Sequence, residues 1–135
     1  MAVTYVLLEL INEVPTRIIG FVALKASSLL SSDDGKYLGT PALEISELAI
    51  DADYEHKGYG NLLIDFAIDT ANHLRRNTLG IRNVVLMADP KAVGFYSKYE
   101  PHFMKIGDWY VIPYEHWNQD CVGMFISLPE LNPGE

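Results

Sequence analysis

One stretch of the sequence, Glu55-His56-Lys57-Gly58-Tyr59-Gly60 (EHKGYG), stands between a run typical of a strand and a run typical of a helix. Two glycines that open a helix leave its first backbone N–H groups unpaired and uncovered, which suits a phosphate. Glu55 brings a negative charge to the same place. The stretch therefore predicts an anion site whose affinity depends on several N–H donors set against one carboxylate.

Upstream of the glycines, the sequence predicts three strands. Residues 3–11 and 17–24 are rich in branched and aromatic side chains, and residues 12–16 between them suit a turn, so we expect a β-hairpin. Residues 31–35 (SSDDG) have strong turn chemistry, and residues 43–50 follow as the third strand.

Downstream, the pattern changes to alternating helices and strands. Apolar residues recur at steps of three and four over 58–78, which predicts an amphipathic helix. Residues 84–87 (VVLM) are continuously apolar, as in a buried strand, and Asp89 followed by Pro90 predicts the start of a second helix. Residues 121–128 suit a closing strand. The order predicts an α/β fold around a mixed sheet.

Composition limits the class of protein. The chain has 135 residues, is 49% hydrophobic and carries a formal net charge of −8, so we expect one globular domain with little nonspecific attraction to nucleic acid or anionic membranes. Its single cysteine, Cys121, excludes an internal disulfide and fits a reducing compartment. No run approaches the ~18 apolar residues of a membrane span, so we expect a cytoplasmic protein.

Three motifs together carry a resemblance to a known family, the GNAT superfamily of N-acetyltransferases. In chain order they are Glu44-Ile45-Ser46-Glu47-Leu48-Ala49-Ile50, Lys57-Gly58-Tyr59-Gly60 and Ala92-x-x-Phe95-Tyr96-x-Lys98. The resemblance covers residues 42–99. It implies one acyl-CoA-binding domain over residues 1–135, with a mixed, mostly antiparallel sheet flanked by helices. From the order of motifs, we expect this chain to lack the strand and two helices with which the family normally begins.

The resemblance also implies the cosubstrate, acetyl-CoA, and the residues that bind it. These are Leu48, Ala49, Ile50, Lys57, Gly58, Tyr59, Gly60, Asn61, Phe95 and Lys98. Glu55 stands where the family usually has Gln or Arg. About four N–H groups, each contributing roughly 1.5–3 kcal/mol, outweigh a carboxylate whose repulsion at this range is ~0.5–2 kcal/mol. We therefore expect weakened rather than abolished affinity, with Lys57 as a compensating charge.

The implied reaction is direct attack of a primary amine on the thioester, which needs a base and an acid. Glu44 matches the catalytic glutamate of histone-acetylating members, and Glu47 lies three residues further on. Strict alternation places these two carboxylates on opposite faces of the sheet, although a bulge in the strand would exchange them. We favour Glu44 as the base, with both being solvated strand residues as the alternative. Tyr96 is the expected acid, or simply a core residue.

Two other hypotheses stay open beside an N-acetyltransferase of amines. An enzyme that acetylates aminoacyl-tRNA, like toxins of the family, needs a basic surface and is disfavoured by the net charge. A non-catalytic module that binds CoA or a partner protein is the third hypothesis. The aromatic residues in 109–117 suit either an acceptor wall or a homodimer interface. No metal site is expected, because the histidines lack ligand spacing.

Overall fold

The computed structural model describes residues 1–33, 36–77, 79–106, 110–111 and 120–129. Within these ranges, side chains are described for all residues except 32, 33, 36, 37, 110 and 111. Seven strands form one sheet in the order β1-β2-β3-β4-β7-β5, and β6 pairs with β2. The elements are β1 (Val3–Ile11), β2 (Val14–Asp33), β3 (Lys36–Ile50), η1 (Ala52–Tyr54), α1 (Tyr59–Asn77), β4 (Asn83–Ala88), η2 (Pro90–Ala92), α2 (Val93–Lys98), β5 (Met104–Lys105), β6 (Tyr110–Val111) and β7 (Val122–Ser127).

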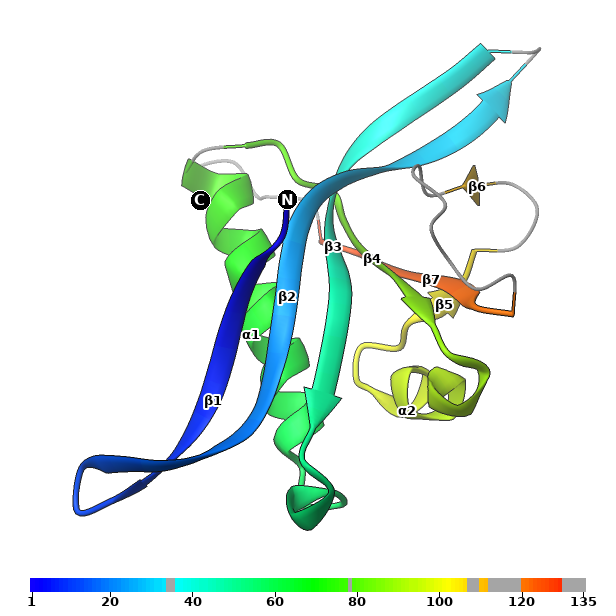
Figure 1. The fold of residues 1–135 in the computed structure, drawn as a ribbon. Helices are drawn as coiled ribbons and strands as arrows, with labels where there is room; N and C mark the ends of the chain where they lie inside the picture. Colours follow the sequence, from blue (N-terminus) through cyan, green and yellow to red (C-terminus); the bar gives the residue numbers. More distant parts are fainter. Residues whose placement is uncertain (34–35, 78, 107–109, 112–119, 130–135) are drawn as a thin grey trace.

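The sheet confirms the prediction of a mixed, mostly antiparallel α/β fold. Only β3 and β4 run parallel among the described strand pairs, because α1 forms the crossover between them. Figure 1 shows α1 lying across one face of β1, β2 and β3. The two helices and the glycine turn between β3 and α1 lie where the sequence predicts them.

The N-terminal hairpin is confirmed, and its turn is shorter than predicted. Asn12 and Glu13 connect β1 to β2 and have φ angles of 51° and 66°, as a two-residue hairpin turn with right-handed twist requires. The strands after it are longer than predicted. β2 and β3 continue as a two-stranded arm beyond the rest of the sheet (Figure 1). Residues 31–33, predicted as turn, belong to β2, and residues 34–35 lie outside the described part.

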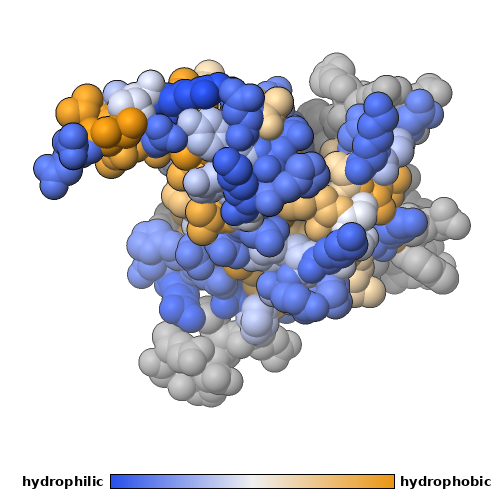
Figure 2. All heavy atoms as spheres, turned by 90° about the horizontal axis from the view of Figure 1, so that it is seen from below, coloured by the Kyte–Doolittle hydropathy of each residue, from blue (hydrophilic) through white to orange (hydrophobic). Residues whose placement is uncertain are grey.

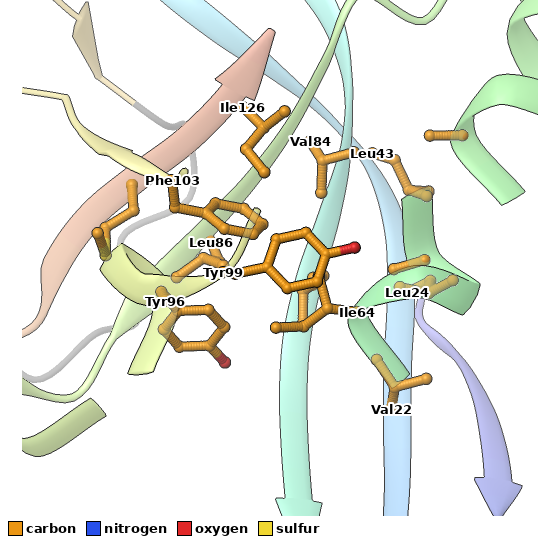
Figure 3. Packing of buried hydrophobic residues seen from close by; sticks show 14 of the residues in the cluster. Val22, Leu24, Leu43, Ile64, Val84, Leu86, Tyr96, Tyr99, Phe103 and Ile126 are labelled. Atoms are coloured by element: carbon orange, nitrogen blue, oxygen red, sulfur yellow. The ribbon is translucent and has the colours of Figure 1, made fainter. Parts of the chain in front are cut away.

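The core lies between the sheet and the helices. The buried face of α1 presents Leu63, Ile64, Ala67 and Ala71, which pack against apolar residues of β2, β3 and β4. Figure 3 shows this cluster continuing to Tyr96, Tyr99 and Phe103, so α2 packs on the same face of the sheet as α1. Each fully buried aliphatic side chain contributes roughly 1.5–3 kcal/mol, so this cluster fixes the helices that carry the site.

Candidate active site

The glycine turn is built by a succession of unusual backbone conformations. Asp51 caps η1 by accepting the N–H of Asp53 at 2.9 Å. His56 and Gly58 then adopt positive φ angles of 62° and 87°, and α1 begins at the next residue. Gly58 is favoured at its position because other residues rarely adopt this conformation. The turn therefore directs the N-terminus of α1 toward the edge of β3.

Gly60 is required for a different reason. A Cβ atom at this position would lie 2.8 Å from Cζ of Phe95. The first turn of α1 and the side chain of Phe95 therefore touch only because Gly60 has no side chain. No acceptor for the backbone N–H groups of Tyr59, Gly60 or Asn61 occurs among the described residues. These N–H groups are free to bind an anion.

Strands β3 and β4 separate beside this turn. They pair from Ala42 to Ile45 on β3, and the described part of β4 has no partner for residues 46–50. Backbone N–H and C=O groups along this edge of β3, those of Leu48 and Ile50 among them, are open to a ligand. The separation of two parallel strands creates a groove without requiring any particular side chain.

Two neighbouring cavities lie along this edge and together are called the groove below. The larger, ≈ 580 Å³, lies at the glycine turn, and the smaller, ≈ 340 Å³, lies between β3 and β4. Leu48 and Ala49 line both cavities. The larger cavity brings together most of the predicted cosubstrate residues: Leu48, Ala49, Ile50, Gly58, Tyr59, Gly60, Asn61, Phe95 and Lys98.

Charges at the larger cavity differ in part from the prediction. Lys91 and Lys98 line it together with His56 and Glu55. Lys57 is not among its lining residues, and the Lys57 ammonium lies over the Tyr54 ring, 5.7 Å from its centroid. The sequence reasoning missed Lys91, although its position directly after the Asp89-Pro90 helix start was a usable signal.

A β-bulge in β3 decides how the two predicted carboxylates lie. Ile45 pairs with Leu24 and Glu47 with Ala23, so Ser46 is an extra residue on β3. The bulge reverses the alternation after Ile45. The opposite-face expectation from strict alternation is therefore wrong, because Glu44 and Glu47 both lie on the face away from α1.

The surroundings of these two carboxylates differ sharply. Glu44 is only 4% exposed, lies 3.3 Å from the Lys25 ammonium, and accepts a hydrogen bond from the Ser27 hydroxyl at 3.0 Å. Glu44 lines neither cavity of the groove. Glu47 is exposed and lines the smaller cavity. Of the two, only Glu47 can meet a substrate in the groove as it stands.

Tyr96 lies where the core meets the smaller cavity. Its ring packs edge-on against Phe95 and Phe103, with centroid separations of 5.0 and 5.5 Å. Its hydroxyl has no hydrogen-bond partner among the described residues, and burial raises the pKa of Tyr96 to about 12. Figure 3 shows the Tyr96 hydroxyl directed away from the apolar cluster. Tyr96 therefore belongs both to the core and to the groove.

Tyr99 makes a useful contrast in the same helix region. Its hydroxyl donates to the Asp65 carboxylate of α1, so it is not free for chemistry. Burial, followed by this hydrogen bond, raises the pKa of Tyr99 above its ordinary value. Tyr99 thus fastens the end of α2 to α1.

The described part of the chain contains no group of three or more His, Cys, Asp or Glu residues arranged to hold a metal ion. None of its helices is long and apolar enough to cross a membrane.

Several solved structures share this fold. The KacTA–DNA complex is 21% identical with a TM-score of 0.65, over 92% of this chain and 66% of that chain. AtaT complexed with acetyl-methionyl-tRNAfMet is 19% identical with a TM-score of 0.68, over 93% and 71%. The NatC complex bound to Gag peptide and CoA is 16% identical with a TM-score of 0.59, over 95% and 71%. This chain thus spans about two thirds of their length.

Curated proteins and family models give different results. No curated protein sequence matches this chain. The model of the acetyltransferase (GNAT) family matches residues 3–100, which include all three motifs on which the resemblance rested. The chain therefore belongs to the acetyltransferase (GNAT) family, as its sequence predicted.

Proposed function

We propose that this protein is an N-acetyltransferase that transfers the acetyl group of acetyl-CoA to a primary amine by direct attack in a ternary complex. The observation that carries the proposal is the groove, which joins the glycine turn, the unpaired edge of β3 and the Tyr96 hydroxyl. An extended thioester can lie along this groove with its phosphates at α1 and its acetyl group beside the bulge.

At the glycine turn, the chain supplies an anion site from two sources. The unpaired N–H groups at the start of α1 face the larger cavity, and the N-terminal end of the helix dipole favours a pyrophosphate there. Lys91 and Lys98 add two positive charges, which offset Glu55. This balance supports binding of CoA despite the acidic residue.

At the bulge, the chain supplies a base and an acid. Glu47 takes a proton from the substrate ammonium, and the freed amine nitrogen attacks the thioester carbonyl carbon. The backbone N–H groups of Leu48 and Ile50 stabilise the negative oxygen that develops. The C–S bond then breaks, Tyr96 donates its proton to the leaving thiolate, and the nitrogen releases its second proton to solvent, which reprotonates Tyr96. With a pKa of about 12, Tyr96 holds this proton throughout the neutral range.

Thiol release with Tyr96→Phe, compared with Tyr99→Phe, tests this assignment. Both substitutions remove one hydroxyl from a buried tyrosine of the same core cluster. Tyr96→Phe should lower kcat about 10²–10⁴-fold while acetyl-CoA still binds, because it removes a general acid. Tyr99→Phe should lower stability and leave kcat within a few-fold. Equal kcat values for the two variants would contradict the role of Tyr96 and favour a non-catalytic CoA-binding module.

A second candidate is an enzyme that acetylates aminoacyl-tRNA. The shared fold with AtaT, which was solved with acetyl-methionyl-tRNAfMet, supports it. Growth arrest on expression, together with N-acetylated aminoacyl-tRNA in the arrested cells, is the result that this candidate predicts. Normal growth at high protein levels would exclude it.

A further inference from the structure

An apolar surface continues the smaller cavity across the open face of the sheet. Phe21 lines this cavity and pairs with Ala49 on one side and with Val6 on the other. Leu8 is two residues from Val6 on β1, and a bulge at Ile19 in β2 pairs Leu8 with Ile18, so both lie on the same face as Val6. Val6, Leu8, Ile18 and Phe21 are called the apolar platform below.

The platform is open in the described part of the molecule. Val6 is 52% exposed, Leu8 38% and Ile18 55%, and α1 covers only the other face of the sheet. Figure 2 shows hydrophobic side chains gathered on the projecting β1–β2 hairpin. Such a contiguous apolar surface on a soluble protein marks a binding site more often than chance.

The two ends of the groove differ in the charged side chains that line them. The glycine-turn end carries Lys91 and Lys98. Glu47 and Asp89 line the smaller cavity, and no Lys, Arg or His is among its described lining residues. Lys25, on the same sheet face, is neutralised by Glu44 at 3.3 Å. The cosubstrate end is thus basic, whereas the acceptor end is acidic and apolar.

We infer that the acceptor is a small primary amine with an aromatic or branched aliphatic body and no phosphate. Its ammonium lies at Glu47, and its apolar body lies on Phe21 and the platform beyond. The ladder supports this geometry, because Glu47 pairs with Ala23 and Phe21 is two residues further, roughly 7 Å along the strand. This inference rests on the proposed N-acetyltransferase function and names the substrate class of that site.

The same features disfavour a polyanionic acceptor. A tRNA acceptor stem needs cations near the reacting amine, because phosphate contacts dominate nucleic-acid affinity. Here two carboxylates line the acceptor end, and the free lysines lie at the cosubstrate end. The platform offers apolar contact where a nucleic acid would present sugar and phosphate.

The test compares 2-phenylethylamine with ethanolamine, which keeps the two-carbon amine and replaces the ring by a hydroxyl. With acetyl-CoA and the wild-type protein, kcat/KM for 2-phenylethylamine should be at least tenfold higher. Phe21→Ala should raise the KM for 2-phenylethylamine about tenfold and leave the KM values for ethanolamine and acetyl-CoA unchanged. Leu62→Ala is the control, since Leu62 is an exposed apolar residue (52%) on α1, away from the platform.

A second variant keeps the test valid where Phe21→Ala reduces folding. Val6→Lys places a cation on an exposed platform position, and it should raise the KM for 2-phenylethylamine by repelling the ammonium and covering apolar surface. Equal rates for the two amines, a higher kcat/KM for aminoacyl-tRNA, or equal effects of Phe21→Ala and Leu62→Ala would each overturn the inference.

A binding measurement separates this inference from the proposed reaction. Saturation-transfer NMR of 2-phenylethylamine with the protein and free CoA needs no turnover. We expect ring-proton signals that are lost in Phe21→Ala and kept in Leu62→Ala. Their absence in the wild-type protein would overturn the acceptor class even where acetyl transfer occurs. Ring-proton signals without any acetyl transfer would contradict the proposed reaction and still support the amine site.

Discussion

Gly60 is the residue at which the cosubstrate turn and α2 come closest, and its replacement makes a sharp prediction. In Gly60→Ala the new methyl would lie 2.8 Å from Phe95 Cζ, so the 38% exposed Phe95 ring must move. Alanine favours the helix by roughly 0.5–1 kcal/mol, so stability should change little. The displaced ring narrows the groove, and the Kd for acetyl-CoA should rise about tenfold in a calorimetric titration.

Gly94→Ala is the control for this substitution. Gly94 also lies in a helix, beside Phe95, and a Cβ there meets no atom within 4 Å. The Kd of the Gly94→Ala variant for acetyl-CoA should equal that of the wild-type protein. Equal Kd values for Gly60→Ala and Gly94→Ala would show that Phe95 is not part of the cosubstrate wall.

The two glutamates should respond to neutralisation in opposite ways. Glu44→Gln leaves Lys25 without its carboxylate in a mostly buried position, and should lower the free energy of unfolding by about 1–3 kcal/mol. Glu47→Gln should leave stability within about 0.5 kcal/mol, because surface substitutions rarely do more, and should lower kcat about 10²–10⁴-fold. Urea unfolding and thiol release measure the pair. A loss of kcat confined to Glu44→Gln would reverse the assignment of the base.

Tyr96 also predicts how stability depends on alkaline pH. Burial raises the pKa of Tyr96 to about 12 in the folded state, against 10.0 ordinarily. Below pH 10 the hydroxyl is protonated in both states, so its contribution is constant. Between pH 10 and 12 the unfolded state ionises first, and the free energy of unfolding falls by about 2–3 kcal/mol. Urea titrations across this range should show a smaller decline for Tyr96→Phe, and an unchanged decline would contradict the burial of this hydroxyl.

At the scale of elements, the N-terminal hairpin braces the cosubstrate turn. Arg17 of β2 lies 2.5 Å from Asp53 and 3.5 Å from Asp51. Glu9 of β1 accepts the hydroxyl of Tyr54 at 2.7 Å, and Tyr54 lines the larger cavity. Two strands that are far from the turn in sequence thus hold Tyr54, which forms part of the wall of the larger cavity.

Removal of this brace should weaken cosubstrate binding without stopping the reaction. Arg17→Gln should raise the KM for acetyl-CoA by up to about fivefold and leave kcat unchanged, since exposed ion pairs are individually weak. Arg76→Gln is the control, because Arg76 is an exposed arginine in the last turn of α1, at the other end of that helix. A similar KM for both variants would show that the hairpin does not position the turn.

For the whole molecule, local sequence signals predicted the elements and most of the cosubstrate site. The glycine turn, the helix after it and the Asp89-Pro90 start are encoded by neighbouring residues, so they could be read directly. The long β2–β3 arm could not, because these serine-rich strands are held by pairing with each other and, at Leu30 and Ser31, with β6. Pairing between strands overrides the weak β-strand propensity of residues 27–33.

The acceptor end of the groove could not be predicted from the sequence, because it is formed by contacts that residue spacing does not reveal. The bulge at Ser46 is set by the register of β3 against β2, and it alone places Glu47 in the groove. Phe21 and Asp89 reach the same cavity from strands and turns far apart in the chain. The predicted aromatic segment 109–117 lies outside the described residues except for 110–111, which form β6. Homodimer formation therefore stays a prediction.

The groove between β3, β4 and the glycine turn should bind acetyl-CoA. Calorimetric titration of the purified protein with acetyl-CoA tests it most directly, with ATP as the comparison because it shares the adenine and phosphates without the thioester arm. We predict a micromolar Kd for acetyl-CoA, equivalent to about −8 kcal/mol, and no heat with ATP. No binding up to millimolar acetyl-CoA would contradict this cosubstrate site and show that Glu55 outweighs the N–H groups and lysines around it.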